Sequence, residues 1–170
     1  FQQAILAYKN GLRLINNSKE IQSDSLKIEL QRIFTYNIGS CYRDMDDYNN
    51  ALVYYKRCLK LLINLNMSTL SCRGNIVWAY KNLAEYISAE EQAIVLLEES
   101  RKQNNYKWIG LSFQYLSSIY YSTHRYEKAL IFSQNSIYIF SDQNDNWNLA
   151  NLLNTQGLIY SAISDVENAK

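Results

Sequence analysis

The sequence has no proline and only five glycines among its 170 residues. A β protein of this length would need more of both, because tight turns between strands use these two residues. The long segments between the few breakers are rich in Leu, Ile, Tyr, Ala, Lys and Glu, a composition typical of helices. The shortage of turn residues therefore predicts an all-α fold.

Excess charge and long apolar runs are also missing. Seventeen basic and sixteen acidic side chains give a formal net charge of +1, and no clustered basic face of the kind that binds nucleic acid is visible. The longest apolar runs have five residues, such as residues 93–97, whereas a membrane span needs roughly 20. We therefore expect no direct nucleic-acid contact and no membrane span.

Residues that carry chemistry are scarce as well. The three cysteines, Cys41, Cys58 and Cys72, form no CxxC pair, and their odd number argues against a disulfide framework. With a single histidine, His124, a structural zinc site is not expected, and no nucleophile or carboxylate is arranged around that histidine. We therefore expect no metal, no cofactor, no catalytic residue and no enzymatic activity. Unpaired thiols favour a reducing, cytoplasmic compartment.

A four-residue pattern, with spacings of 3, 6 and 3, recurs three times along the chain. Small residues at its first and last positions suit two helices that cross closely, and the aromatic residue one turn on fills the space beside the crossing. The period of the pattern predicts a stack of helical hairpins. The three copies are Gly39-Tyr42-Tyr48-Ala51, Ser117-Tyr120-Tyr126-Ala129 and Gly157-Tyr160-Val166-Ala169.

Two further segments match the pattern in part. Phe1, Ala4 and Tyr8 are typical of the second helix of a hairpin. Ala93 and Leu97 predict another second helix, in a divergent unit that lacks the glycine and the tyrosine of the pattern and turns near residues 87–89. The anchoring alanines are then Ala4, Ala51, Ala93, Ala129 and Ala169.

The hairpins predict where helices begin and end. Asp145 or Asn146 is expected to cap the helix after the polar loop 141–146, and Asp46, Asp47 and Ser88 lie near predicted starts of second helices. The predicted helices span residues 1–16, 23–45, 48–65, 67–86, 89–104, 106–123, 126–141 and 146–162, with a last helix from about residue 165.

The stretch from Tyr36 to Tyr42, followed by Asp47-Tyr48 and by Ala51, resembles the tetratricopeptide repeat (TPR) family. The units are about 40 residues long instead of 34 and lack the family's proline. Such long units resemble those in the TPR sensor domains of Gram-positive peptide-pheromone receptors, and also those of kinesin light chains and of sensor parts of some bacterial regulators.

The resemblance implies a right-handed superhelical solenoid of antiparallel helix hairpins. It further implies a single TPR-like repeat domain over residues 1–170 with about four to five units. We interpret the chain as an excerpt of a longer repeat protein.

In the TPR family, ligands often lie along the concave face that the first helices of the hairpins form. Amides, hydroxyls and tyrosines on that face bind an extended peptide backbone and offer flat apolar area. The residues at the groove positions of this chain include few lysines, which disfavours a clamp for acidic C-termini. Each of these residues is also of a type that is common on solvent-facing surfaces. Transferring the groove positions gives Tyr36, Ser40, Arg43, Asp44, Gln114, Ser118, Tyr121, Ser122, Asn151, Asn154 and Ser161, with Lys81 and Glu85 in the divergent unit.

The resemblance implies a protein- or peptide-binding module, the sensor or adaptor part of a bacterial regulator. The alternative is a structural scaffold or a homo-oligomerisation domain in which the groove holds no ligand.

Overall fold

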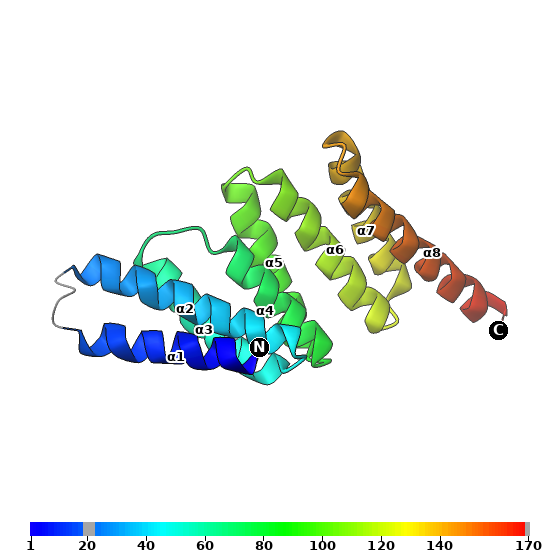
Figure 1. Ribbon diagram of the computed structural model, residues 1–170. Coiled ribbons are helices and arrows are strands. Elements are labelled where there is room, and N and C mark those ends of the chain that lie inside the picture. Colours follow the sequence, from blue (N-terminus) through cyan, green and yellow to red (C-terminus); the bar gives the residue numbers. More distant parts are fainter. Residues whose placement is uncertain (19–22, 169–170) are drawn as a thin grey trace. The chain divides into compact units, whose positions relative to one another are not determined.

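The computed structural model describes residues 1–18 and 23–168. Over these residues the chain forms α-helices and no strands, which confirms the all-α prediction (Figure 1). The eight helices described are α1 (Gln2–Asn17), α2 (Asp24–Asp44), α3 (Tyr48–Asn64), α4 (Leu70–Asn82), α5 (Tyr86–Lys102), α6 (Tyr106–Ser122), α7 (Tyr126–Asp142) and α8 (Asn146–Asn168).

The helices belong to two compact units, Phe1–Glu85 and Tyr86–Lys170. In the first unit α1 packs on α2, α2 on α3 and α3 on α4; in the second, α5 packs on α6, α6 on α7 and α7 on α8. Within each unit, each helix therefore packs on the next one along the chain, which is the arrangement that a series of helical hairpins requires.

Six connections contain one residue with a left-handed backbone conformation and use no glycine for it. The residues within hairpins are Asp46, Ala84 and His124, and those between hairpins are Asn66, Asn104 and Asn144. In each set the second residue follows the first by 38 positions and the third follows the second by 40. The next residue donates its N–H to the carbonyl five positions back, which closes the helix end in a Schellman motif.

The first two copies of the small-residue pattern lie at close helix crossings, as predicted. A Cβ on Gly39 would lie 2.9 Å from the ring of Tyr55, and Ala51 beside it is fully buried. In the second copy, the Ser117 hydroxyl donates to the carbonyl of Ala129 at 2.9 Å. Small side chains at these positions let α2 approach α3 and α6 approach α7.

The predicted turn of the divergent unit is wrong. The left-handed residue is Ala84, so α4 ends at Asn82 and α5 begins at Tyr86, earlier than the predicted turn near residues 87–89. Ser88 lies inside α5 and caps no helix.

With the turn at Ala84, the divergent unit keeps most of the pattern. Tyr80, Tyr86 and Ala89 take its last three positions, and Val77 replaces the glycine. The anchoring alanine is therefore Ala89, which is fully buried. The pattern pointed to Ala93 because Ala93 is also fully buried one helical turn later, and a period of 3.6 residues does not separate the two.

The third copy of the pattern is not completed within the described residues. Helix α8 continues without a break to Asn168, so the turn predicted between residues 162 and 165 is absent, and Val166 lies on the same helix as Gly157. Residues 162–166 contain no glycine, proline or asparagine that would end the helix. A Cβ on Gly157 would meet nothing within 4 Å. Ala169 lies outside the described residues.

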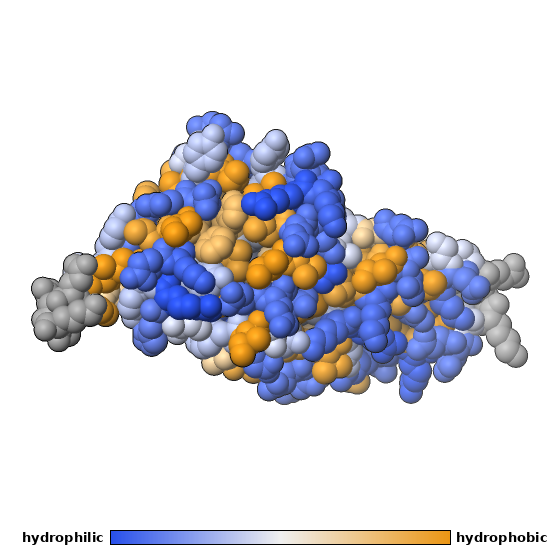
Figure 2. Space-filling model, turned by 180° about the vertical axis from the view of Figure 1, so that it is seen from behind, coloured by the Kyte–Doolittle hydropathy of each residue, from blue (hydrophilic) through white to orange (hydrophobic). Residues whose placement is uncertain are grey.

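The predicted helix caps at two aspartates are confirmed. The carboxylate of Asp47 accepts from the backbone N–H of Asn50 at 3.1 Å, and that of Asp145 accepts from the N–H of Asn148 at 3.2 Å. None of the described helices is long and apolar enough to cross a membrane. On the face that Figure 2 shows, hydrophobic patches alternate with hydrophilic side chains.

Candidate binding site on α2 and α4

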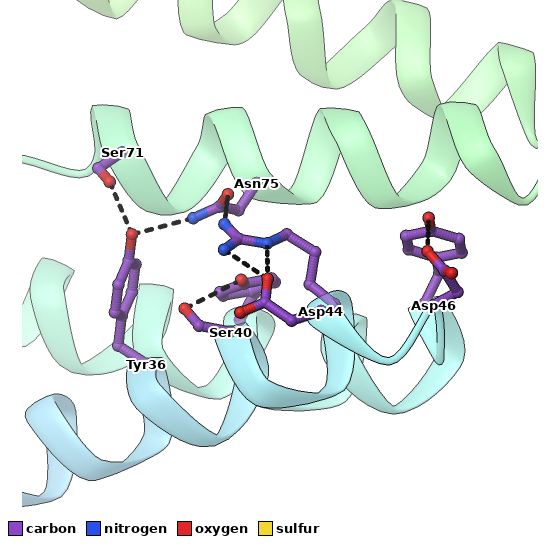
Figure 3. Close-up of polar contacts among 9 residues, drawn as sticks. Tyr36, Ser40, Asp44, Asp46, Ser71 and Asn75 are labelled. Carbon is purple, nitrogen blue, oxygen red and sulfur yellow. Dashed lines mark hydrogen bonds and ion pairs between the residues drawn. The ribbon is translucent and has the colours of Figure 1, made fainter. Parts of the chain in front are cut away.

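Polar side chains connect α2 with α4 in the first unit. Tyr36, Ser40 and Arg43 are four and three residues apart and so lie on one face of α2. Ser71 and Asn75 are four residues apart on α4 and point toward that face (Figure 3). We call these five residues, together with Asp44 and Tyr55, the α2–α4 network.

The hydrogen bonds of the network form a continuous line from α2 to α4. A guanidinium can only donate, and Arg43 donates to the side-chain oxygen of Asn75 at 3.1 Å. The amide nitrogen of Asn75 then donates to the Tyr36 hydroxyl at 3.1 Å, and that hydroxyl lies 3.1 Å from the Ser71 hydroxyl (Figure 3). Either hydroxyl of this pair can donate to the other, and the line of hydrogen bonds ends at the exposed Ser71.

Arg43 is held in place from its other side by Asp44. Its Nε and Nη2 both donate to one carboxylate oxygen of Asp44, at 2.9 and 2.8 Å. Burial acts to lower the pKa of Arg43, but the hydrogen bond to Asp44 and the electrostatic attraction of Asp44 and of neighbouring tyrosines together outweigh it, and the net pKa is raised. The guanidinium therefore stays charged and fixed in orientation at the edge of α2.

A buried tyrosine of α3, Tyr55, lies beneath the rest of the network. The Tyr55 hydroxyl donates to Ser40 at 3.3 Å, and its ring meets that of Tyr36 edge to face at a centroid distance of 5.7 Å. Burial raises the pKa of Tyr55 to about 12, so this hydroxyl remains neutral at physiological pH. Because Tyr55 also lies against Gly39, the closely packed helix crossing fixes the position of the polar face above it.

A hollow of about 330 Å³ opens beside the end of the network. It lies within the first unit, where the end of α3 and the start of α4 approach α2. Tyr36 and Ser71 belong both to the network and to the wall of this hollow, which we call the α2–α4 pocket. Its full lining is Arg32, Tyr36, Leu62, Met67, Ser68, Ser71 and Cys72.

Lys81 lies in the last turn of α4, three residues before Ala84. Arg43 and Tyr121 likewise lie three residues before the left-handed residues Asp46 and His124. Arg43, Lys81 and Tyr121 therefore occupy equivalent positions in their hairpins. Lys81 is half-buried, and this burial lowers the pKa of its amino group.

The predicted site residues of the second unit lie on α6 and α8. Gln114, Ser118 and Tyr121 are partly buried on one face of α6, and the Tyr121 ring packs on Tyr126 at a centroid distance of 5.9 Å. Asn151 and Asn154 are exposed on α8.

These five residues do not form a side-chain network like that of the first unit among the contacts described. The amide of Asn151 donates to the Trp147 carbonyl at 3.0 Å, one turn back on its own helix. The contacts described thus join Tyr36, Ser40 and Arg43 into one site.

Two residues of the site, Ser71 and Asn75, are not among those that the sequence predicts. In the divergent unit, the candidate residue Lys81 lies at the end of α4, at the position equivalent to Arg43, and the sequence pattern assigns no candidate to the first two turns of that helix. The spacing of four residues on a first helix, which matches that of Tyr36 and Ser40, is the feature that identifies them.

The described residues contain no group of three His, Cys, Asp or Glu side chains placed to hold a metal ion. The site instead offers hydroxyls, an amide and a guanidinium around an apolar hollow. These are groups that bind neutral polar atoms and carboxylates through hydrogen bonds.

Comparison with known families and structures supports the repeat prediction. Residues 35–62, which span the C-terminal half of α2 and most of α3, match the tetratricopeptide repeat family model. The matched segment contains Gly39, Ala51 and Tyr55, which form the close helix crossing. A search of curated protein sequences finds no match.

Two solved structures superpose on nearly the whole chain. BtubC (BKLC) from P. vanneervenii has a TM-score of 0.80 at 18% sequence identity, over 99% of this chain and 68% of that one. The apo form of RapI has a TM-score of 0.80 at 21% identity, over 99% of this chain and 46% of that one. The chain thus spans about half the length of RapI, and at these identities the likeness concerns the fold.

Proposed function

Given that the chain is a TPR-like helical-repeat protein, we propose that it binds a protein or peptide segment on the α2–α4 network. The observation that carries the proposal is the fixed line of polar groups from Arg43 through Asn75 and Tyr36 to Ser71. Such a line suits an extended peptide, because its backbone presents donors and acceptors at regular intervals.

The preorganisation of the network supports binding. Arg43 is oriented by Asp44, and Tyr36 is positioned by Asn75 and by the ring of Tyr55. Side chains that are already ordered lose less conformational entropy when a ligand arrives. The contacts described use three of the five N–H groups of Arg43, which leaves two for a peptide carbonyl or carboxylate.

The proposal extends to a role as the sensor or adaptor part of a bacterial regulator. The support for this finer role is the likeness of the fold to RapI and the length of the repeat units, which resembles that of peptide-pheromone receptors. We propose no catalytic role for the α2–α4 network, because among the residues described its hydroxyls, amide and ion-paired guanidinium are arranged for recognition.

Isothermal titration against a library of extended peptides tests the proposal. We expect Tyr36→Phe combined with Asn75→Ala to weaken binding about tenfold or more, because all three hydrogen bonds of the line from Arg43 to Ser71 are lost. Tyr138→Phe is a matched control, since Tyr138 is exposed on α7 in the other unit. Unchanged affinity in the double variant would refute binding at this site.

A second candidate function is a scaffold that assembles through apolar helix faces. Large apolar side chains are exposed at both ends of the described chain, namely Phe1, Leu6 and Leu14 near the start and Trp147 and Leu153 on α8. Exposed apolar area of this kind is common at protein interfaces. Sedimentation velocity over a range of concentrations distinguishes the two, because self-association predicts a sedimentation coefficient that rises with concentration.

A further inference from the structure

The α2–α4 pocket has the size of a subsite for one side chain. Its volume of about 330 Å³ lies at the lower limit of the roughly 300–1,000 Å³ found for small-molecule pockets. A whole peptide does not fit into such a space. One large side chain with its adjoining backbone does.

The walls of the pocket are mainly apolar. Leu62 and Cys72 are both buried, and the thiol of Cys72 is turned to the carbonyl of Tyr55 at 3.0 Å, so it is already bound within the protein. Met67 lies in the connection between α3 and α4 and is 43% exposed at the pocket wall. A thioether is flexible and polarisable, so it adapts to aliphatic groups of different shape.

The charges at the pocket select against charged side chains. Arg32 places a guanidinium in the lining, which disfavours lysine or arginine. The same guanidinium is engaged by Glu29 through two donors, and this ion pair raises the pKa of Arg32 and lowers that of Glu29. An acidic side chain would have to compete with the Glu29 carboxylate. A neutral side chain avoids both costs.

The rim of the pocket is able to hold the backbone beside the inserted side chain. The line of hydrogen bonds ends at the Ser71 hydroxyl, which has one donor and two acceptor positions and can therefore accept from Tyr36 and still donate its own proton. The Ser71 oxygen therefore lies where it can donate to a peptide carbonyl. The polar rim and the apolar wall meet at Tyr36 and Ser71, which belong to both.

We propose that the α2–α4 pocket is a specificity subsite that takes one neutral aliphatic side chain of leucine, isoleucine or methionine size. The inference deepens the proposed peptide-binding function, on which it rests, and names the residue type that the peptide carries at this point. The side chain enters between Leu62, Met67 and Cys72, while its backbone carbonyl accepts from Ser71.

The two methionines of the chain make a direct test possible. Met67 lines the pocket, whereas Met45 lies at the end of α2, against the cluster around Ile38 in the same unit. Methyl-labelled methionine gives one NMR signal for each. The probe is N-acetyl-leucine methylamide, which carries one side chain and two peptide groups.

We expect the probe to shift the Met67 methyl signal in a saturable way, with a dissociation constant of about millimolar order, and to leave Met45 unchanged. N-acetyl-lysine methylamide and N-acetyl-glutamate methylamide should produce at most about a tenth of that saturation at the same concentration. Equal responses to the three probes, or equal shifts of both methionines, would overturn the inference.

Two blocking variants provide the structural control. Ser68→Trp and Ser71→Leu place bulk in the pocket and should abolish the Met67 response, whereas Asn64→Trp, an exposed position outside the lining, should keep it. An unchanged Met45 signal shows that each variant is folded. A response that survives in both folded blocking variants would place the probe elsewhere and overturn the inference.

The outcome of this test can be distinguished from the outcome for the proposed peptide-binding function. If the leucine probe binds but no peptide's affinity depends on Tyr36 and Asn75, the subsite is supported and peptide binding along the network is refuted. If peptides depend on the network but show no preference for an aliphatic residue, the network stands and the subsite falls.

Discussion

Single residues set how sharply each hairpin turns and how closely its helices approach. A left-handed conformation is needed at Asp46, Ala84 and His124, and no glycine is present at any of them. Aspartate tolerates this conformation better than alanine, which has no polar side chain to bond locally. Ala84 is therefore the least suited of these turn residues.

The substitution Ala84→Gly should increase the free energy of unfolding by about 1 kcal/mol, because glycine adopts a positive φ without the Cβ penalty. Ala7→Gly is the matched control in the same unit. Ala7 is exposed within α1, where glycine should cost about 1 kcal/mol. Urea unfolding followed by circular dichroism measures both, and destabilisation by Ala84→Gly would contradict the assigned turn.

The two glycines of the repeat pattern should respond in opposite ways to alanine. Gly39→Ala brings a Cβ to 2.9 Å from the ring of Tyr55, which is fully buried. We expect a cost of about 1–3 kcal/mol for this overpacking, reduced by the better helix propensity of alanine. Gly157→Ala meets nothing within 4 Å and should stabilise α8 by up to about 1 kcal/mol. Denaturant unfolding of the two variants gives the comparison.

At the scale of elements, one partly buried cluster connects three helices of the second unit. Glu90 of α5 accepts from the Tyr120 hydroxyl of α6 at 2.6 Å and from Arg125, at the start of α7, at 2.7 Å. The Arg125 guanidinium also lies over the Tyr120 ring, 4.3 Å from its centroid. Tyr120 belongs to the repeat pattern, so the pattern position whose ring packs beside the helix crossing also donates the hydrogen bond to Glu90.

Acidification should loosen this cluster. Burial acts to raise the pKa of Glu90, but the hydrogen bonds from Tyr120 and Arg125 outweigh it and hold the pKa below its ordinary value. The unfolded chain therefore binds a proton at higher pH than the folded chain does. The contribution of Glu90 is complete above the unfolded pKa and is lost as the pH falls through the lower, folded pKa.

We expect the free energy of unfolding to fall between pH 7 and about pH 4, and to fall less in Glu90→Gln, which has no proton to bind in this range. Glu98→Gln, a substitution on the exposed face of the same helix, is the matched control. Parallel urea titrations at the two pH values measure the difference, and the same slope in all three proteins would argue against the assigned role of Glu90.

At the scale of the whole molecule, the small net charge determines which forces are available for recognition. The net charge is +1, so the chain has little long-range attraction for a charged partner. The α2–α4 network offers mostly neutral donors, and its one guanidinium is already paired with Asp44. Short-range hydrogen bonds and apolar contacts are therefore expected to dominate binding.

The affinity for a neutral peptide should change by less than about threefold between low and high salt, because screening acts mainly on exposed charges at long range. Titration calorimetry at two salt concentrations checks this. A steep loss of affinity at high salt would point to a charged groove instead of the α2–α4 network.

Much of the fold follows from sequence because its causes are local. Helical period, small residues at fixed spacing and aspartate caps act within one hairpin, so they predict the roles of Gly39, Ala51 and Asp47 correctly. They do not predict the register of the divergent unit, because Ala89 and Ala93 share one helix face and both are buried. The end of the helix after Gly157 is mispredicted for a related reason, since the pattern specifies crossings and not helix ends.

The sequence by itself determined that the chain is a series of helical hairpins, and it named Tyr36, Ser40, Arg43 and Asp44 as residues of one helix face. Only the tertiary structure decided what lies opposite them. The bonds from Arg43 to Asn75 and from Tyr36 to Ser71 join positions more than 30 residues apart. Their geometry depends on how α2, α3 and α4 pack, and that packing also creates the pocket. Helix periodicity specifies which residues share a face, whereas contacts between faces require the packed core.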